Sequence, residues 1–235
     1  MSDLATQITE NVTAVRGRIA EAAARSGRAA DDVTLVAVTK YVGPEEIRAL
    51  VEAGCTTLGE SRPQQLADKA QAVAGLPIRW HMIGHLQRNK VRRTLPLVAM
   101  VESADSLKLV EAINRIAGEL SLRVPILLEV NVSGEEAKHG FAPDAIEPSL
   151  AELAGFANIE IRGLMCMAGL DSGLDGARRE FAAIRELRDR LRANCPEGIA
   201  MDDLSMGMSA DYEIAIEEGA TIVRVGSALY ERISP

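Results

Sequence analysis

Eight short apolar segments with the character of strands alternate with helical patterns from residue 33 to the end of this 235-residue chain. Apolar residues at helical spacing follow each of the first seven segments, most clearly at 44–53 and 175–194. Alternating strands and helices form parallel sheets, and eight such units in about 200 residues predict an α/β fold, a single (β/α)8 TIM barrel. The expected strands are 34–39, 56–59, 78–83, 98–102, 125–132, 159–166, 202–206 and 221–226.

The segment before this alternation, residues 3–25, predicts an extra N-terminal amphipathic helix, because its apolar residues recur at helical spacing. An open doubly wound sheet is the alternative fold, but no GxGxxG sequence follows the first strand. No linker, low-complexity tract or block of charge divides the chain. We therefore expect one domain that spans residues 1–235.

Composition argues against several classes of protein. Hydrophobic residues make up 47% of the chain, enough for one large core, and the net charge of −8 argues against a nucleic-acid-binding face. Cys55, Cys166 and Cys195 are widely separated and odd in number, which favours free thiols in a cytoplasm over disulfides or a zinc site. We expect no signal peptide, and no stretch approaches the roughly 20 apolar residues of a membrane span. The expectation is a soluble cytoplasmic protein that binds neither nucleic acid nor membrane.

Lys40 ends the first expected strand, at the end that faces the active-site mouth in α/β barrels. Side-chain alternation places Val38, Val36 and Thr34 on the same face, so that the amine would stand above an apolar column. Desolvation there lowers the pKa of an amine, as condensation with a carbonyl requires. A lysine that reaches from the strand end into water is the alternative, and this feature alone does not choose between them.

The last strand and the segment after the seventh predict a phosphate site. Gly226 permits close backbone approach and Ser227 adds a hydroxyl, in loops that often hold phosphate in barrels. Ser209 adds another hydroxyl, and it also suits the N-cap of a helix at 210–218. A plain strand-to-turn glycine is the alternative role for Gly226. Arg224 lies on the same strand face as Gly226, and a buried guanidinium requires an acceptor.

An amine, a phosphate cradle and an arginine between them suit a phosphorylated carbonyl compound. Pyridoxal 5′-phosphate is such a compound, and its ring nitrogen would be an acceptor for Arg224. A class I aldolase that binds a sugar phosphate through a lysine Schiff base uses similar residues, with Glu129 as a candidate partner of Lys40. The residue types alone leave both interpretations open.

Six segments occur in an order that is specific to one family. WHMIGHLQRNK at 80–90 and SMGMSAD within 205–211 are the most specific, and the others are LVAVTK, LGE, RGLM and VRVGS. Together they resemble the pyridoxal phosphate homeostasis protein family, over nearly the whole chain. The resemblance implies a barrel like the N-terminal domain of bacterial alanine racemase, with pyridoxal 5′-phosphate held as an internal aldimine, a Schiff base. The site residues that it implies are Lys40 for the aldimine, Arg224 for the pyridine nitrogen, and Ser205, Ser209, Gly226 and Ser227 for the phosphate.

Two positions depart from the family pattern. Ser61 stands where the family has an asparagine thought to approach the cofactor, and with Gln64 it also matches a capping box. His85 stands where the family has proline or a small residue. His81 could border the cofactor ring or be a hydrogen-bonded structural histidine. Because no third ligand has metal spacing with these two histidines, we expect no metal site.

The resemblance leaves two classes of function. One is a non-catalytic carrier that buffers pyridoxal phosphate or delivers it to apo-enzymes, and the other is an amino-acid racemase. Racemisation requires an acid/base group on each face of the ligand, and alanine racemase takes the second, a tyrosine, from a further domain that we do not expect after Pro235. Arginine at the ring nitrogen also weakens the electron sink. We therefore expect a monomeric homeostasis protein without substantial catalysis.

Overall fold

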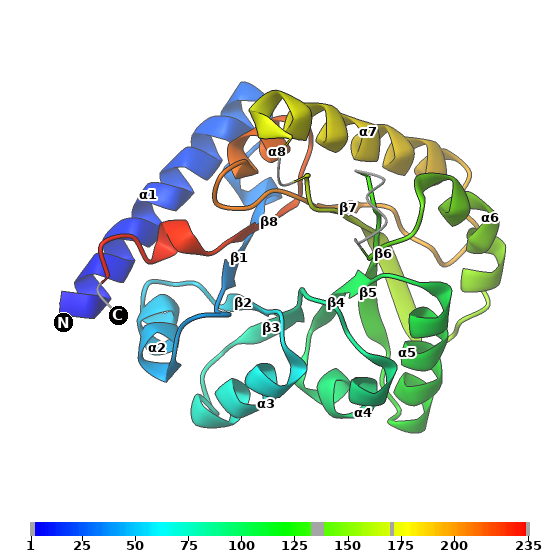
Figure 1. Ribbon diagram of the computed structural model, residues 1–235, viewed down its shortest axis with the longest axis horizontal. Coiled ribbons are helices and arrows are strands. Elements are labelled where there is room, and N and C mark those ends of the chain that lie inside the picture. The colour runs from blue at the N-terminus through cyan, green and yellow to red at the C-terminus, as the bar shows by residue number, and fades with distance from the viewer. Residues whose placement is uncertain (1–2, 133–138, 170–171, 234–235) are drawn as a thin grey trace.

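The computed structural model describes residues 3–132, 139–169 and 172–233 of the chain. Eight parallel strands close into a barrel in chain order, so the (β/α)8 prediction is confirmed (Figure 1). Each strand overlaps the range expected from its apolar run. The strands are β1 (Thr34–Val38), β2 (Thr57–Glu60), β3 (Arg79–Met82), β4 (Met100–Ala104), β5 (Val124–Glu129), β6 (Ile159–Met165), β7 (Asp203–Ser205) and β8 (Ile222–Val225).

Helices follow the first seven strands and surround the barrel (Figure 1). A proline in the first turn begins three of them, α2, α3 and α6, where its missing N–H group would have no partner within the helix. These outer helices are α2 (Pro44–Glu52), α3 (Pro63–Ala72), α4 (Val91–Thr94), α5 (Leu107–Glu119), α6 (Pro143–Leu153), α7 (Gly173–Ala193) and α8 (Tyr212–Glu217). Short 3-10 helices are η1 (Ala30–Asp32), η2 (Arg88–Lys90), η3 (Leu95–Leu97) and η4 (Ser227–Leu229).

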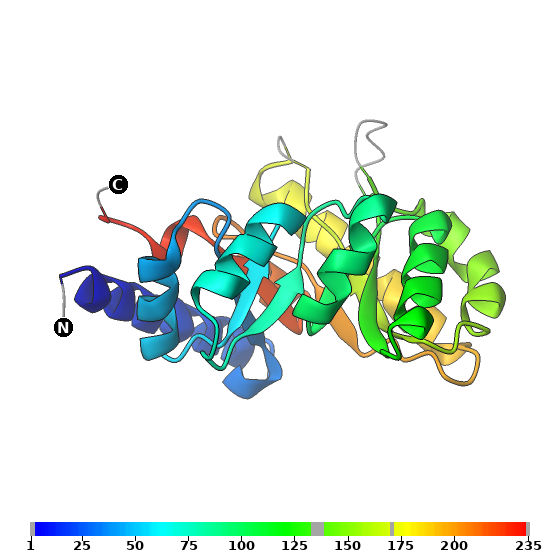
Figure 2. The ribbon, with the colours of Figure 1, turned by 90° about the horizontal axis from the view of Figure 1, so that it is seen from below.

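The expected N-terminal helix is present as α1 (Asp3–Arg25), which contacts α2, α8 and η4. Its buried stripe includes Ile8, Val12 and Val15, as the helical spacing predicted. Asn11 Nδ2 donates to the carbonyl oxygens of Leu229 and Glu231 at 3.2 and 2.9 Å. The helix is thereby attached to the C-terminal segment, and the first turn of α1 and the segment after η4 lie on the same side of the barrel in two views (Figures 1 and 2).

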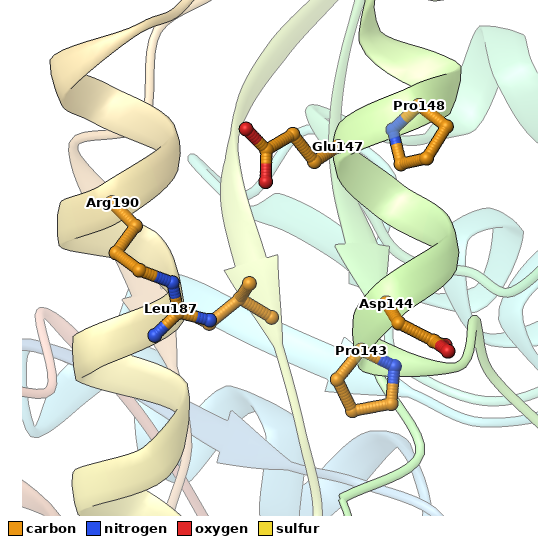
Figure 3. Close-up of a pocket in the computed structure, with 6 residues that line it drawn as sticks. All are labelled: Pro143, Asp144, Glu147, Pro148, Leu187 and Arg190. Carbon is orange, nitrogen blue, oxygen red and sulfur yellow. The ribbon is translucent and has the colours of Figure 1, made fainter.

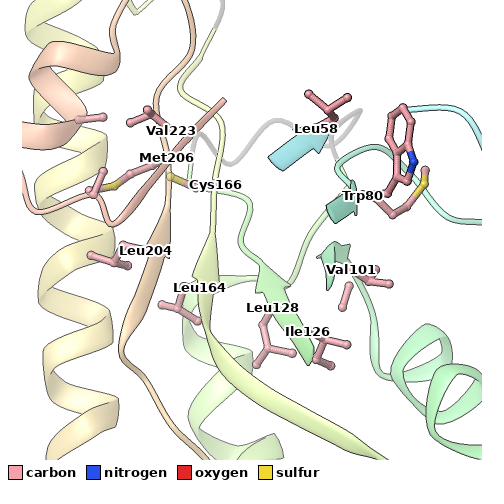
Figure 4. Close-up of a cluster of buried hydrophobic side chains, with 14 of the residues drawn as sticks. Leu58, Trp80, Val101, Ile126, Leu128, Leu164, Cys166, Leu204, Met206 and Val223 are labelled. Carbon is pink, nitrogen blue, oxygen red and sulfur yellow. The ribbon is translucent and has the colours of Figure 1, made fainter. Parts of the chain in front are cut away.

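The two faces of the strands are both buried, which accounts for their nearly continuous apolar runs. Side chains that point away from the barrel axis, such as Leu128, Leu164 and Val223, belong to the large cluster that includes the helices (Figure 4). A second, smaller cluster fills the barrel interior. Its buried members are Val36, Met100, Leu127, Met165 and Ile222.

The barrel interior changes from apolar to charged toward the C-terminal ends of the strands. Glu102, Glu129 and Arg224 each follow an apolar interior residue of the same strand by two positions, and all three are buried. Residues two apart in a strand share a face, so these charges also point inward. We call this end of the barrel, with the loops that follow the strands, the mouth.

Two further expectations were tested by the structure. All three cysteines are free, Cys55 and Cys166 buried and Cys195 partly exposed, as the sequence predicted. Among the described residues, no helix combines the length and the apolar character that a bilayer-spanning segment requires.

Candidate functional site

Lys40 lies in a turn after β1 and is exposed to solvent. Its amine is 4.9 Å from the centroid of the Tyr41 ring, and no described residue forms a hydrogen bond or ion pair with it. The expected desolvated amine above an apolar column is therefore wrong. Strand alternation stops at Val38, two residues before the lysine, and Thr34 at the far end of the column is exposed.

Thr39, at the end of β1, is bound to the neighbouring strand β2. Its N–H group donates to the carbonyl of Gly59 at 2.9 Å, and its hydroxyl is 3.2 Å from a carboxylate oxygen of Glu60. Lys69 of α3 donates to the Thr39 carbonyl at 2.6 Å and to Glu60 at 2.5 Å. This buried ion pair fixes Thr39 and leaves Lys40 to project beyond it.

A loop that carries the predicted phosphate residues lies next to this turn, because β8 pairs with β1. Ser209 Oγ accepts hydrogen bonds from the N–H groups of Gly226 and Ala228 at 3.1 and 3.4 Å. Ser227 is exposed. The structure therefore brings together Ser209, Gly226 and Ser227, as expected. Ser209 does not cap a helix, because α8 begins only at Tyr212, after Asp211.

Gly207 explains how the chain turns from β7 into this loop. Its φ of +91° lies in the left-handed region, and a Cβ there would approach Ala215 Cβ to 2.5 Å. A glycine is required at this position both by backbone conformation and by packing. The SMGMSAD motif thus includes a residue whose role is to direct the loop toward β8.

Glu102 is the centre of a buried network that sequence reasoning missed. Its carboxylate accepts a hydrogen bond from Ser205 Oγ at 2.6 Å and lies 2.6 Å from His81 Nδ1. Arg224 Nη1 lies 3.9 Å from the same carboxylate and hydrogen-bonds Ser205, while Nη2 donates to the Cys166 carbonyl at 2.8 Å. The signal in the sequence was an acidic residue within an apolar strand, but its partners come from three other strands.

The network keeps Glu102 ionised. Burial alone would raise the pKa of this carboxyl, but the hydrogen bond and charge of His81, the charge of Arg224 and the Ser205 hydroxyl outweigh burial and hold the pKa below its usual range. His81 is 4% exposed, and its Nδ1 contacts the Glu102 carboxylate. It therefore has the hydrogen-bonded structural environment that was one of its two expected roles.

Three expectations differ from this arrangement. Arg224 does not lack an acceptor inside the protein, since Ser205 and the Cys166 carbonyl provide two. Ser205 is fully buried and bound to Glu102, rather than placed with Ser209 at the loop. The predicted capping box of Ser61 is also absent, because Pro63 begins α3 with Arg62 as its N-cap.

Ser61 instead contacts Glu60 at the end of β2. Its N–H group donates to a carboxylate oxygen of Glu60 at 2.7 Å, and its hydroxyl is 3.5 Å from the same atom. Gly84 of the loop after β3 approaches it closely, and a Cβ on Gly84 would lie 2.5 Å from the Ser61 carbonyl oxygen. The serine is half-buried at the mouth.

Glu129 is 5% exposed at the end of β5. In the closed barrel β5 lies opposite β1, so Glu129 and Lys40 are on opposite sides of the mouth. Burial and the nearby charge of Asp105 raise the pKa of this carboxyl from 4.5 to about 7, while Arg224 and His85 oppose the shift. No described residue forms a hydrogen bond or an ion pair with its carboxyl group. Glu129 is therefore a buried carboxyl that exchanges protons near neutral pH.

Two surface hollows differ in what lines them. One, of about 400 Å³, is lined by Lys40, Tyr41 and Lys69 together with Val42, Gln65 and Asp68. The other, of about 530 Å³, lies outside the barrel between α6 and α7 (Figure 3). None of the predicted site residues lines the second hollow, and Lys40 is the one predicted site residue that lines the first.

The residues at the β1 and β8 ends fit a ligand that carries an aldehyde and a phosphate. Among the described residues no carboxylate binds the Lys40 amine, so a molecule in solution can reach it. The N–H groups of Gly226 and Ala228 are bound to Ser209 Oγ, while the hydroxyls of Ser209 and Ser227 are O–H donors of the kind that phosphate oxygens accept. Arg224 has two acceptors for its several N–H groups, which leaves donors for a polar atom above it.

Comparisons with known proteins identify the family to which the chain is similar. A family profile described as alanine racemase, N-terminal domain, matches residues 11–232. A protein of Aquifex aeolicus named pyridoxal phosphate homeostasis protein is 37% identical over 221 residues, covering 94% of this chain and 96% of the relative. A Pseudomonas aeruginosa protein with the same name is 40% identical over 226 residues, covering 95% of this chain and 94% of the relative. The structure of PipY from Synechococcus elongatus with PLP bound superposes with a TM-score of 0.85 at 32% identity, covering 95% of this chain and 99% of PipY.

Proposed function

The chain belongs to the pyridoxal phosphate homeostasis protein family, within the proteins that share the alanine racemase N-terminal domain, and on that premise we propose that it binds pyridoxal 5′-phosphate at the barrel mouth. We further propose that it buffers or delivers this cofactor without substantial catalysis of its own. The observation that carries the proposal is the position of Lys40, an exposed and unpaired amine beside the phosphate-type loop at 226–228.

Covalent attachment is assigned to Lys40. Lys40 would hold the cofactor, whose aldehyde would supply the carbon for condensation with the uncharged amine and loss of water. Lys40 is suited to this role because no carboxylate holds its amine, whereas Lys69 in the same hollow is bound to Glu60 and to the Thr39 carbonyl. Since Lys40 is exposed, free amines in solution have access to the same linkage. That access favours release and transfer of the cofactor.

The remaining predicted residues hold the other ends of the cofactor. Ser209 and Ser227 offer hydroxyl donors to the phosphate, and Gly226 permits close approach of its backbone while its N–H group holds Ser209 in place. Arg224 donates from below, and its guanidinium has no acceptor atom. Ser205 and His81 act through Arg224 and Glu102, and Ser61 is a candidate contact at the β2 end.

The tyrosines support a carrier rather than a racemase. A racemase requires a second acid/base group opposite the lysine. Tyr230 donates its hydroxyl to the Val38 carbonyl at 3.0 Å, and burial raises its pKa far above the ordinary value. Tyr212 is buried in the core, and Tyr41 is 83% exposed with its ring against Lys40. None of the three is placed as the tyrosine base of alanine racemase is expected to be.

Reduction with borohydride tests the binding site. The purified protein loaded with pyridoxal phosphate should absorb visible light, and reduction should attach the cofactor to the peptide that contains Lys40. Lys40→Ala should lose this adduct, whereas Lys108→Ala, a change at an exposed lysine of α5, should retain it. An adduct mapped to Lys69 or Lys90 in the wild-type protein would contradict the assignment.

A paired assay tests carrier against racemase. The loaded protein is incubated with L-alanine and other L-amino acids, and the D-enantiomers are measured beside reactivation of an apo-enzyme that requires pyridoxal phosphate. We expect reactivation without D-amino acids. Turnover at about 1–10³ per second, the range of ordinary enzymes, would establish a racemase instead.

We propose a reducing cytoplasm as the site of action, which three free thiols support. We also propose a monomer, and sedimentation at several concentrations tests it. The partners that we propose are pyridoxal phosphate and the apo-enzymes that receive it.

A further inference from the structure

His85, Asp105 and His139 converge on the β3–β5 side of the mouth. His85 Nδ1 is 2.6 Å from Asp105 Oδ2, and His139 Nδ1 is 3.8 Å from the same oxygen. The two imidazole rings are stacked with centroids 4.0 Å apart. One ligand atom from each residue lies within 4.8 Å of the other two. The three side chains come from segments that are far apart in the sequence, so only the fold brings them together.

Each segment is held in place by the strands beneath it. Ser103 of β4 donates its hydroxyl to the Gly84 carbonyl at 2.6 Å, which fixes the loop that carries His85. Phe141 donates its N–H group to the Glu129 carbonyl at 2.7 Å, which attaches the segment of His139 to the end of β5. Asp105 follows β4 directly. The cluster therefore rests on the ends of adjacent strands.

The charge around the cluster is incompletely balanced. Asp105 is 8% exposed, and its Oδ1 accepts a hydrogen bond from the Ser106 hydroxyl at 2.9 Å, while its Oδ2 faces the histidines. Glu129 adds a second buried carboxyl, next to Asp105 in the register of β4 and β5. Its carboxyl group has no hydrogen-bond or ion-pair partner among residues 3–132, 139–169 and 172–233. Asp105 Oδ2 therefore faces two imidazole nitrogens at the edge of a buried acidic region, an arrangement in which all three groups can donate lone pairs to one cation.

We propose that His85, Asp105 and His139 bind a divalent transition-metal cation such as Zn²⁺. Two imidazole nitrogens and one carboxylate oxygen form a donor set that zinc accepts, with a further coordination position open to water or a ligand oxygen. Magnesium and calcium prefer oxygen ligands alone and do not suit this set. Tetrahedral ligands at about 2.0–2.1 Å from zinc lie roughly 3.3 Å apart, a separation between the two observed distances to Oδ2.

Binding through His85 Nδ1 uses the lone pair of that nitrogen. A proton that lies between His85 Nδ1 and Asp105 therefore moves to His85 Nε2 or to solvent as the cation takes its place. The side chains of His85 and His139 are 42% and 59% exposed, so the cation reaches the cluster without rearrangement of the core. This site is independent of the proposed cofactor site, because it shares no residue with the β1 and β8 ends.

Cobalt(II) titration of the untagged chain tests the proposal, since a histidine tag would itself bind metal. After treatment with a chelator and without pyridoxal phosphate, the protein should bind one Co²⁺ per chain with visible absorption bands, and zinc should displace it. His85→Gln and His139→Gln should each weaken binding at least about 10- to 100-fold, the loss seen when even an outer partner of a metal ligand is removed. Both positions are exposed enough for the variants to fold, which circular dichroism verifies.

Cys195→Ser is the matched control, because Cys195 is the one partly exposed thiol among the three and could bind these metals on its own. It should bind cobalt as the wild-type chain does. Wild-type affinity in both histidine variants, or loss of binding in Cys195→Ser alone, would overturn the site. Absence of stoichiometric cobalt or zinc binding near neutral pH would show that Asp105 merely hydrogen-bonds the two imidazoles.

Discussion

Two sides of the barrel mouth differ in how completely their polar groups are paired. Beneath the mouth, Glu102 joins His81, Ser205 and Arg224 in a buried network with short hydrogen bonds. At the β1 end, the amine of Lys40 is exposed and bound to no described residue. Each member of the network is hydrogen-bonded to another member, which restricts their side chains. A molecule in solution can reach the Lys40 amine.

The contrast separates positioning from reactivity. The Arg224 guanidinium is held in one orientation by Ser205 and the Cys166 carbonyl before any ligand binds. An exposed amine forms and breaks a covalent bond under the control of solution concentrations. A buried polar network below the mouth and an accessible lysine above it suit a protein that binds a cofactor and releases it again.

The largest effect should come from breaking the network. Glu102→Ala leaves the buried Arg224 and His81 without their carboxylate, and removal of one partner of a buried ion pair costs about 3–5 kcal/mol. Urea denaturation at pH 7 measures the loss of unfolding free energy. Glu102→Gln keeps the shape and part of the hydrogen bonding, so it should lie between the wild type and Glu102→Ala. Equal midpoints for all three proteins would show that the network does not stabilise the fold.

The fold was predictable because its signal is repeated along the chain. Each strand is buried on both faces, so an apolar run marks it, and glycine or proline marks many of its boundaries. Alternation failed at the end of β1. Thr39 is still bound to Gly59 and Glu60 of β2, but Lys40 lies in the turn that follows, where the alternation of strand faces no longer applies.

The site was only partly predictable, for a different reason. Gly226 and Ser227, which are neighbours in the sequence, were correctly placed beside Ser209 of the loop after β7. Contacts across the barrel have no local pattern. Glu102 meets Ser205 and His81 from other strands, and His85 meets His139 only after the barrel closes.

The second effect should appear as pH dependence at Glu129. Its pKa is raised from 4.5 to about 7, so its contribution to stability is complete below pH 4.5 and is lost as the pH rises through about 7. Glu129→Gln removes this loss. The variant should therefore be more stable than the wild type by up to about 3 kcal/mol at pH 8, given about 1.4 kcal/mol per pKa unit, with little difference at pH 4.5.

This measurement is made in chelator and without cofactor, so that neither ligand changes the charge balance. Stability is taken from urea denaturation between pH 4.5 and 8. Because Glu102 has a lowered pKa, its contribution is lost only as the pH falls below the ordinary range, outside this interval. A constant difference between the two proteins across the interval would mean that Glu129 does not titrate there.

The smallest effect on stability should come from substitution of Lys40, the residue proposed to attach the cofactor. Lys40→Met removes an exposed amine that no described side chain binds, so unfolding free energy should change by no more than about 0.5 kcal/mol. Lys69→Met makes the same change in the same hollow, but there the amine binds Glu60, which is fully buried, and the Thr39 carbonyl. That variant should lose about 3 kcal/mol of unfolding free energy. This is near the lower end of the cost of removing one partner of a buried ion pair, because the lysine side chain is 11% exposed. Borohydride-fixed cofactor should show the opposite order, absent in Lys40→Met and retained by the folded fraction of Lys69→Met. Equal destabilisation by both substitutions would mean that Lys40 also stabilises the fold. The contrast between the buried polar network and the exposed amine would then be wrong.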